Sequence, residues 1–278
     1  MPWLHVLLLA LVQGITEFLP VSSSGHLVMI WEGLGTVGVA VPEQTLADQL
    51  ILDVAVHVGT LGAVCIYFRQ DLLYMALGLV HALKGRIDGG ARLAFYIFLS
   101  TIPLGLVGLF FKEAIVLNLH DIEVVAWATI GFGIVLFIAD RAGMTLHRIE
   151  HMTGVNAVLI GLSQVLALIP GTSRSGITMS MARILGFERQ EAARFSMLMS
   201  IPAIAAAGAL VGMDLARAGD IVVGVDAFVA ALLAFFFALA AIAFLMAWLR
   251  RSSFTPFVIY RLLLGAALLY WIYVVAPA

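Results

Sequence analysis

Long apolar runs alternate with short polar segments along most of the chain. A bilayer crossing needs about 20 consecutive apolar residues in a helix. Six of the runs meet that length, at roughly 49–69, 93–112, 121–140, 191–213, 225–249 and 255–276. The pattern therefore predicts an all-α polytopic membrane protein with six transmembrane helices.

Two further apolar runs are shorter and end differently. Residues 3–19 end at a proline followed by a serine cluster, and residues 155–169 end at a second proline and a second small polar segment. Shorter apolar stretches follow the two breaks, at 27–41 and 177–187. Helix, polar break and helix is the pattern of a re-entrant hairpin, and backbone that breaks at membrane depth must be buried or line a wet cavity. The two breaks predict two re-entrant helical hairpins around a central polar cavity.

The two breaks resemble each other in sequence. When Pro20 is aligned with Pro170, "LPVSSSG" lies over "IPGTSRS", and "FYIFLSTIP" later finds an echo in "FSMLMSIP". We therefore predict one integral-membrane domain, 1–278, with approximate internal repeats 1–140 and 141–278. An odd number of spanning runs separates the hairpins, so the second repeat is expected to be inverted relative to the first, as in many membrane binding sites.

Basic residues gather in alternate connections between the predicted spans. They are Arg69, Lys84, Arg86 and Arg92, then Arg141 and Arg148, then Arg183, Arg189 and Arg194, and finally Arg250 and Arg251. By the positive-inside rule these connections are cytoplasmic. Both termini are then outside, the first hairpin enters from outside, and the second enters from the cytoplasm.

Composition agrees with a membrane protein. The chain is 63% hydrophobic and 12% charged, with a mean hydropathy of +1.08. A soluble domain is about 25% charged, so the apolar excess is expected to face lipid. The net charge of −2 carries little information. The single cysteine, Cys65, excludes an internal disulfide and a zinc site built from cysteines.

A carboxylate and an amide stand four residues apart just before the first break. On a helix this spacing places Gln13 and Glu17 on one face. Their oxygens together could hold a hard cation such as Mg²⁺ or Ca²⁺. Two alternatives stay open: Glu17 as a carboxylate at a helix end near the interface, and Gln13 as a residue that packs helices together.

The two polar breaks share a chemistry. Their small residues let backbone N–H groups turn toward one point, where with the hydroxyls they can bind phosphate oxygens. Arg174 is a guanidinium at membrane depth, so it needs an anion, and its planar fork suits a phosphate. The alternative is a structural salt bridge to Glu17. His26 lies within a turn of three hydroxyls, as activation of a nucleophile by a base requires, and His57 is a weaker candidate for the same cavity. The pattern predicts a site for an amphipathic phospholipid or prenyl phosphate.

The motifs that carry this chemistry resemble those of a known family. "QGITEFLPVSSSGH" and "PGTSRSG" are similar to the two signatures of the bacterial undecaprenyl-diphosphate phosphatases associated with bacitracin resistance, and the resemblance covers essentially the whole chain. It implies hydrolysis of undecaprenyl diphosphate to undecaprenyl phosphate and inorganic phosphate, which recycles the lipid carrier for peptidoglycan synthesis. It also implies a divalent cation, the bacterial cytoplasmic (inner) membrane and an active site that faces the periplasm. Gln13 stands where many members have a second glutamate, and Ser24 where threonine is common.

The resemblance also implies roles for individual residues. Glu17 and Gln13 would bind the metal, with the choice between Mg²⁺ and Ca²⁺ open. The expected substrate-binding residues are Ser22, Ser24, Gly25, Thr172, Ser173, Arg174 and Ser175. Ser23 is the preferred nucleophile, with His26 as base or proton shuttle and with Glu17 and Arg174 completing the catalytic set. Attack by His26 itself, through a phosphohistidine, stays open.

The expected partners are a polyprenyl diphosphate lipid and the membrane, with no nucleic acid, and a homodimer is left open. A polyprenyl-phosphate flippase or transporter is the alternative function, because inverted repeats with hairpins at the midplane are typical of secondary transporters. A channel is disfavoured, since the sequence has no ring of like residues to form a filter.

Overall fold

The structure of the chain is a computed structural model. It describes residues 3–23, 25–27, 30, 46–119, 121–218 and 225–275. In these residues every regular element is helical, in the order α1 (Trp3–Thr16), α3 (Leu46–Tyr67), α4 (Arg69–Leu83), α5 (Gly89–Leu119), α6 (Ile122–Ala142), η1 (Ile149–His151), α7 (Gly154–Gln164), η2 (Val165–Leu168), α8 (Arg174–Ile184), α9 (Arg189–Ala218), α10 (Val225–Trp248), α11 (Thr255–Tyr270) and η3 (Trp271–Val275).

Six stretches of the described residues are long and apolar enough to cross a membrane. They are Gln49–Tyr67, Gly89–Phe110, Ile122–Ala142, Arg189–Met213, Val225–Trp248 and Thr255–Val275. The six predicted spans and the all-α class are therefore confirmed, with boundaries that differ by a few residues. One helix, α4, lies in a segment that the apolar pattern predicted to be a connection.

The two shorter apolar helices each end at a polar break. They are Trp3–Thr16 and Gly154–Leu168, and α8 follows the second break and packs against α7. Helix, break and helix is thus present in the second half of the chain. In the first half, most of the stretch 27–41 lies outside the described residues. The position of either hairpin relative to a membrane, like the internal repeat, stays a prediction.

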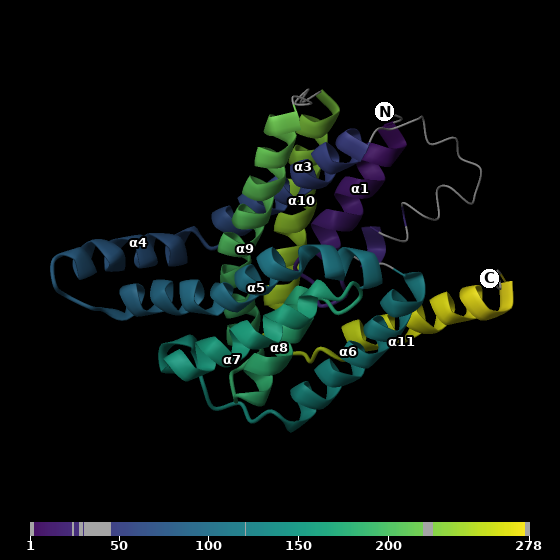
Figure 1. Cartoon of the computed structure of the whole chain (residues 1–278). Helices are drawn as coiled ribbons and strands as arrows, with labels where there is room; N and C mark the ends of the chain where they lie inside the picture. The colour runs from purple at the N-terminus through teal and green to yellow at the C-terminus, as the bar shows by residue number, and fades with distance from the viewer. Residues whose placement is uncertain are drawn as a thin grey trace.

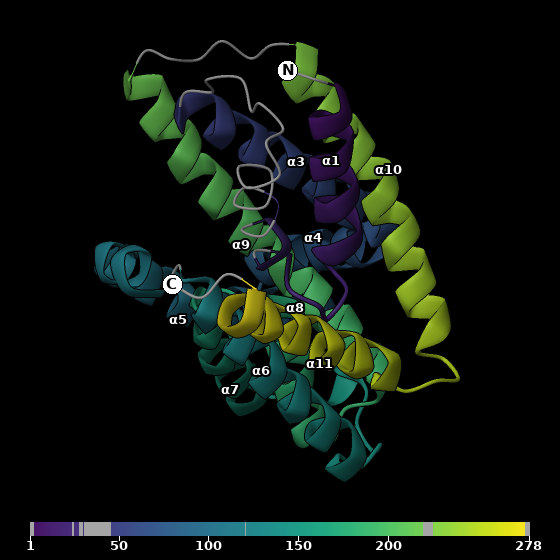
Figure 2. The same ribbon diagram turned by 90° about the vertical axis from the view of Figure 1, so that its right-hand side faces the viewer.

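One group of helices is formed by α1, α3, α9 and α10. Figures 1 and 2 both show α1 alongside α10, with α3 and α9 nearby. Glycines allow the close approach: a Cβ on Gly14 would lie 2.6 Å from the Cβ of Phe237, and one on Gly59 would lie 2.1 Å from the carbonyl oxygen of Ala231. Small residues at helix contacts are typical of membrane proteins, where close packing drives association. The contact at Gly14 fixes the end of α1, where the first break begins.

A second group contains α6, α7, α8 and α11. Figures 1 and 2 show α11 alongside α6, and the two helices are in contact. A Cβ on Gly265 of α11 would lie 2.4 Å from the side chain of Ile130 and 3.0 Å from the carbonyl oxygen of Ala126, so this contact is also close. The end of α1 and the start of α8 meet between the two groups.

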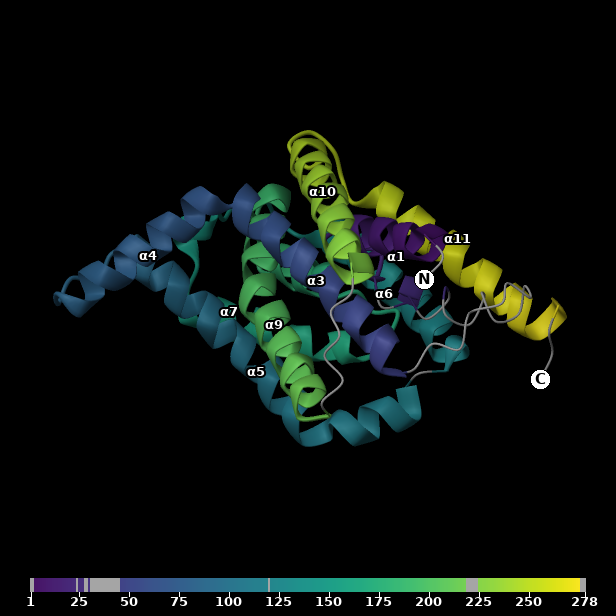
Figure 3. The same cartoon turned by 90° about the horizontal axis from the view of Figure 1, so that it is seen from above.

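The connections that carry the basic residues lie together at one end of the molecule. Arg194 at the start of α9 forms an ion pair with Asp71 of α4, and Arg148 lies 3.1 Å from Glu188. Figure 3 shows α4 and the first part of α5 projecting from the rest of the molecule as a paired arm. The opposite end holds the start of α1, the end of α9 and the start of α10 (Figure 2).

A buried ionic cluster fixes α8 at this basic end. The Asp140 carboxylate accepts from the Nε atoms of Arg183 at 3.2 Å and Arg189 at 2.6 Å, and from the backbone N–H of Phe254 at 3.2 Å. Asp140 and Arg183 are almost completely buried. Because a buried charge without its partner is strongly destabilising, this cluster holds the C-terminal end of α8 in place. The other end of α8 begins with Arg174.

Candidate active site

The first break positions a buried carboxylate. The backbone N–H of Glu17 still bonds to the carbonyl of Gln13 at 3.0 Å, so the helical turn continues past the end of α1. Gln13 Nε2 donates to Glu17 Oε2 at 2.9 Å, which confirms that the two side chains share one face. Gln13 is fully buried and Glu17 is 8% exposed. A carboxylate this deep needs several donors to remain charged.

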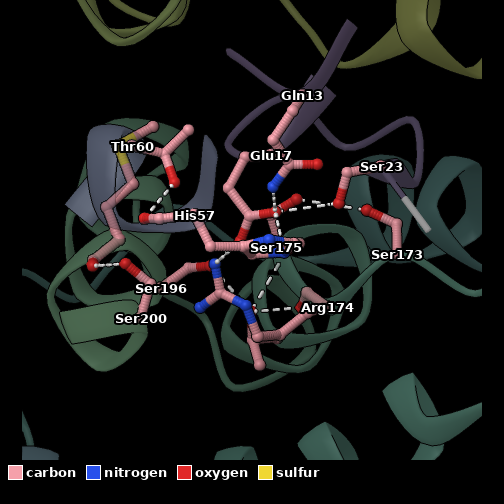
Figure 4. Close-up of polar contacts among 12 residues, drawn as sticks. Gln13, Glu17, Ser23, His57, Thr60, Ser173, Arg174, Ser175, Ser196 and Ser200 are labelled. Carbon is pink, nitrogen blue, oxygen red and sulfur yellow. Dashed lines mark hydrogen bonds and ion pairs between the residues drawn. The ribbon is translucent and has the colours of Figure 1, made fainter. Parts of the chain in front are cut away.

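Both breaks supply donors to Glu17. Ser23 Oγ donates to Oε2 at 2.8 Å, and Arg174 Nη2 donates to Oε1 at 3.2 Å (Figure 4). The expected convergence of the two breaks on one polar centre is therefore confirmed, and so is the salt bridge that was the alternative for Arg174. This carboxylate is the point where residues from the two ends of the chain meet.

The two breaks share a backbone geometry. Ser22 and Ser173 both adopt left-handed backbone angles, with φ of 76° and 71°. Each side chain accepts from an N–H three residues later, at Gly25 in the first break and Gly176 in the second. This is the capping arrangement of a helix N-terminus.

The shared geometry differs by one residue from the sequence alignment. The alignment on the prolines places Ser22 over Thr172, whereas the backbone angles and capping bonds make Ser22 equivalent to Ser173. Ser23, the expected nucleophile, then corresponds to Arg174. The capping serine, which has positive φ in both breaks, sets the register here, and the proline does not.

Other expected phosphate-binding residues lie beneath the site. Ser175 Oγ donates to the carbonyl of Leu19 at 2.9 Å and bonds to Ser173 Oγ at 3.1 Å, so it ties the two breaks together. Gly25 lies against the second break, since a Cβ on it would lie 3.5 Å from the Cα of Gly171. Ser24 lies outside the described residues.

Several polar atoms at this centre are buried without a hydrogen-bond partner in the described part of the chain. They are Gln13 Oε1, Arg174 Nη1 and Thr172 Oγ1. A buried donor or acceptor left in this state costs about 1–3 kcal/mol. Arg174 Nη1 can donate to an anionic group, and Gln13 Oε1, beside the Glu17 carboxylate, can bind a cation. The two atoms together indicate a site for a ligand that carries both an anionic group and a cation.

A cavity of about 300 Å³ lies above these residues. Its polar lining consists of Glu17, Asp53, His57 and Arg174, and its apolar walls include Leu50 and Val54 of α3 and Ile204 and Val211 of α9. The expectation that His57 lines the cavity is confirmed. Its Nδ1 bonds to the carbonyl of Asp53 at 2.6 Å and therefore carries a proton, which directs Nε2 toward Glu17 Oε2 at 4.0 Å.

His26 faces a different partner. Its Nδ1 lies 2.6 Å from the carbonyl of Ser22, and since a carbonyl only accepts, Nδ1 is the donor. Its Nε2 lies 2.5 Å from the hydroxyl of Tyr260, and the two rings stack with centroids 5.7 Å apart. The structure thus brings Ser23 to Glu17 and directs the imidazole of His26 toward α11.

Comparison with known proteins places this geometry in a family. The sequence pattern of the family described as "Bacitracin resistance protein BacA" matches residues 6–267, which include both breaks. The chain belongs to this BacA family. It is 51% identical over 272 residues to "Undecaprenyl-diphosphatase 1" of Rhodospirillum rubrum, covering 96% of this chain and 94% of that protein. It is 48% identical over 279 residues to "Undecaprenyl-diphosphatase" of Hahella chejuensis, covering 99% and 100%. It is 46% identical over 271 residues to "Undecaprenyl-diphosphatase" of Roseobacter denitrificans, and the match covers 97% of this chain and 98% of that protein.

In this BacA-family chain the donor set fits a hard cation that is shared with a ligand. Among the described residues no group of three His, Cys, Asp or Glu side chains could hold a metal ion. The oxygen atoms available to a cation at this centre are those of Glu17, Gln13 and Ser23, and only Glu17 supplies a carboxylate. Mg²⁺ is often bound by one or two carboxylates together with phosphate oxygens of the substrate, so these residues fit such a cation.

Three features of the BacA-family site were missed in the sequence. Tyr260 and Arg261 of α11 reach the first and second breaks, and the hydroxyl of Thr178 bonds to Ser196 at 2.7 Å beneath them. Arg261 had a usable signal, because an arginine inside a 20-residue apolar run is expensive and marks a functional position. Tyr260 and Thr178 had none.

Proposed function

We propose that this protein hydrolyses undecaprenyl diphosphate to undecaprenyl phosphate and inorganic phosphate. The observation that carries the proposal is the pair of Glu17 and Arg174, which lines a cavity with apolar walls and to which Ser23 is hydrogen-bonded. The names of the similar proteins describe the same activity. In the cell the reaction would recycle the lipid carrier for peptidoglycan synthesis, and the family description connects it with bacitracin resistance.

The diphosphate is bound at the start of α8. Arg174 supplies the unpartnered Nη1, and the first turn of the helix supplies N–H groups that have no partner inside the helix. Pairing with Glu17 holds the guanidinium in place until the anion arrives. The prenyl chain follows the apolar walls of α3 and α9 toward lipid.

The reaction requires one nucleophile and one proton acceptor. Ser23 Oγ attacks the distal phosphorus, its proton passes to the Glu17 carboxylate to which it already donates, and undecaprenyl phosphate leaves. Water then cleaves the phosphoserine and releases inorganic phosphate. Arg174 stabilises the charge that develops on the phosphoryl oxygens. His26 holds the first break through Ser22 and Tyr260.

A divalent cation, Mg²⁺ or Ca²⁺, belongs to the proposal. Glu17 and Gln13 Oε1 would hold it, and it would neutralise diphosphate charge. Gln13 Oε1 is buried and unpartnered, which supports this role.

The site is proposed to face the periplasm of a bacterial inner membrane. The cavity is lined by the first half of α3 and the second half of α9, and these halves lead away from the end that carries the basic connections. If that basic end is cytoplasmic, as the positive-inside rule requires, the cavity leads to the outer face.

Purified protein in detergent should release phosphate from a polyprenyl diphosphate, and a chelator should abolish release.

Glu17→Gln keeps the size and removes the charge, so it should lower kcat by at least about 100-fold, because it removes the proton acceptor and a metal ligand. The matched control is Glu150→Gln, an exposed carboxylate at the basic end, which should retain wild-type turnover. Absence of phosphate release from the wild-type protein would contradict the proposed hydrolysis and favour lipid transport.

Ser23→Ala should abolish turnover but leave substrate binding largely intact, because Arg174 and the first turn of α8 remain. Ser252→Ala, in the connection before α11, is the control and should behave as wild type. Rapid quenching of the wild-type reaction should trap an acid-stable phosphoserine. Substantial turnover by Ser23→Ala, or an acid-labile adduct on His26, would rule out the serine mechanism.

Thiol labelling tests the orientation. In a Cys65→Ser background, a cysteine introduced at Val225, which is 72% exposed at the start of α10, should react with a membrane-impermeant reagent in intact cells. A cysteine introduced at Lys84 should react only after the membrane is opened. The reverse pattern would show that the site faces the cytoplasm.

A further inference from the structure

Arg261 is a buried arginine that the reaction above does not use. It lies in α11, within the membrane span Thr255–Val275, and its side chain is completely buried. In the part of the chain that the structure describes, it forms no salt bridge with a carboxylate. A guanidinium without a counter-ion at this depth is costly, so its hydrogen bonds must have a specific use.

The guanidinium is saturated by backbone carbonyl groups. It has five N–H groups and makes five hydrogen bonds, one from each. Nε donates to the carbonyl oxygen of Thr129 at 3.0 Å. Nη1 donates to the carbonyl oxygens of Pro20 at 3.3 Å and Thr172 at 3.0 Å. Nη2 donates to those of Gly171 at 2.8 Å and Ala128 at 3.5 Å. They come from α6, from the first break and from the second break. One planar fork thus joins both breaks to the same helix.

Glycines make room for this arrangement. A Cβ on Gly133 of α6 would lie 3.2 Å from the Cβ of Arg261, and one on Gly176 in the first turn of α8 would lie 3.1 Å from its Nη1. Arg261 therefore lies directly beneath the N-terminal turn that bears Arg174. It is not among the residues that line the cavity.

The bonds also determine which way the peptide units face. In a planar trans peptide the N–H points opposite to the carbonyl of the preceding residue. Because the carbonyl of Thr172 points at Arg261, the N–H of Ser173 is directed away from it. Ser173 then adopts positive φ and caps α8. The uncompensated positive charge beneath this turn adds to the attraction of the helix N-terminus for an anion.

We propose that Arg261 is a positioning residue of the BacA-family site, which holds the peptide units of both breaks in place and so leaves the N–H of Ser173 facing the diphosphate. It acts without touching the substrate. The role rests on the proposed phosphatase function for its kinetic consequences, but the arrangement of the breaks can be measured without substrate.

Arg261→Lys is the decisive variant. Lysine keeps the charge but places three donors on one atom, so it cannot join carbonyls on both sides of a planar fork. We expect a folded protein in which KM rises and kcat falls, each by about tenfold or more. Hydrogen exchange measured by mass spectrometry, without substrate, should become faster in peptides that cover 17–23 and 169–176 and stay unchanged in α3 and α10.

Two further variants separate positioning from general stability. Arg183→Lys replaces an equally buried arginine whose bonds lie at the other end of α8, so it should lower thermal stability and leave exchange in both breaks unchanged. Gly133→Ala adds a Cβ that lies 3.2 Å from the Cβ of Arg261, so it should displace that side chain slightly and give a weaker form of the Arg261→Lys effects. This variant provides a test if Arg261→Lys does not fold.

The outcomes are distinct. Wild-type kinetics and wild-type exchange in Arg261→Lys would overturn the proposal, because charge alone would then be sufficient. An equal increase in exchange throughout the protein would also overturn it, since Arg261 would then be a general structural residue. If the wild-type protein released no phosphate while the exchange difference was confined to the two breaks, the phosphatase function would fail and the positioning role would stand.

Discussion

The site depends on one buried ion pair that joins two distant parts of the chain. Glu17 and Arg174 are 157 residues apart in sequence and 3.2 Å apart in space. Neither charge could remain at this depth alone, because each would lose its hydration without compensation. Their pairing is incomplete, since Arg174 Nη1 has no partner in the described residues. An anionic ligand can therefore enter by taking up a donor that the protein itself does not use.

The surrounding fold keeps these two charges in place. Close helix contacts at Gly14 and Gly59 fix α1 and α3, while the Asp140 cluster fixes the far end of α8. Ser175 joins the breaks at the level of the site, and Arg261 joins them from beneath. Rigid placement of donors is what electrostatic catalysis requires, because donors that are already oriented need no reorganisation as charge develops. The apolar walls of the cavity leave the lipid tail of a substrate in an environment like the membrane.

Much of this organisation follows from the sequence, for identifiable reasons. Bilayer thickness fixes the length of a spanning helix, so the apolar runs identified the six spans. Helical periodicity placed Gln13 beside Glu17, and the cost of a buried guanidinium indicated that Arg174 needs an anion. These are local or solvent-imposed constraints, and they can be read from one segment at a time.

The remaining features depend on contacts between segments. His26 bonds to Tyr260 of α11, 234 residues away in sequence. No local pattern could therefore show that the imidazole faces α11 while Ser23 bonds to Glu17. The exact equivalence of the two breaks is set by the positive φ of Ser22 and Ser173, which the neighbouring prolines obscured. The carbonyl groups that Arg261 binds carry no sequence signal, because every residue has one.

Glu17 and Arg174 form an interacting buried pair before any substrate binds. A double-mutant cycle on the substrate-free protein measures this interaction, with Glu17→Gln, Arg174→Gln and the double variant unfolded by denaturant in mixed micelles. Removing one partner leaves the other charge buried, so each single change should cost about 3–5 kcal/mol, and the double change should cost less than the sum by about 1–3 kcal/mol. Additive effects, within about 0.5 kcal/mol, would show that the two residues do not interact and that the buried pair does not hold the site together.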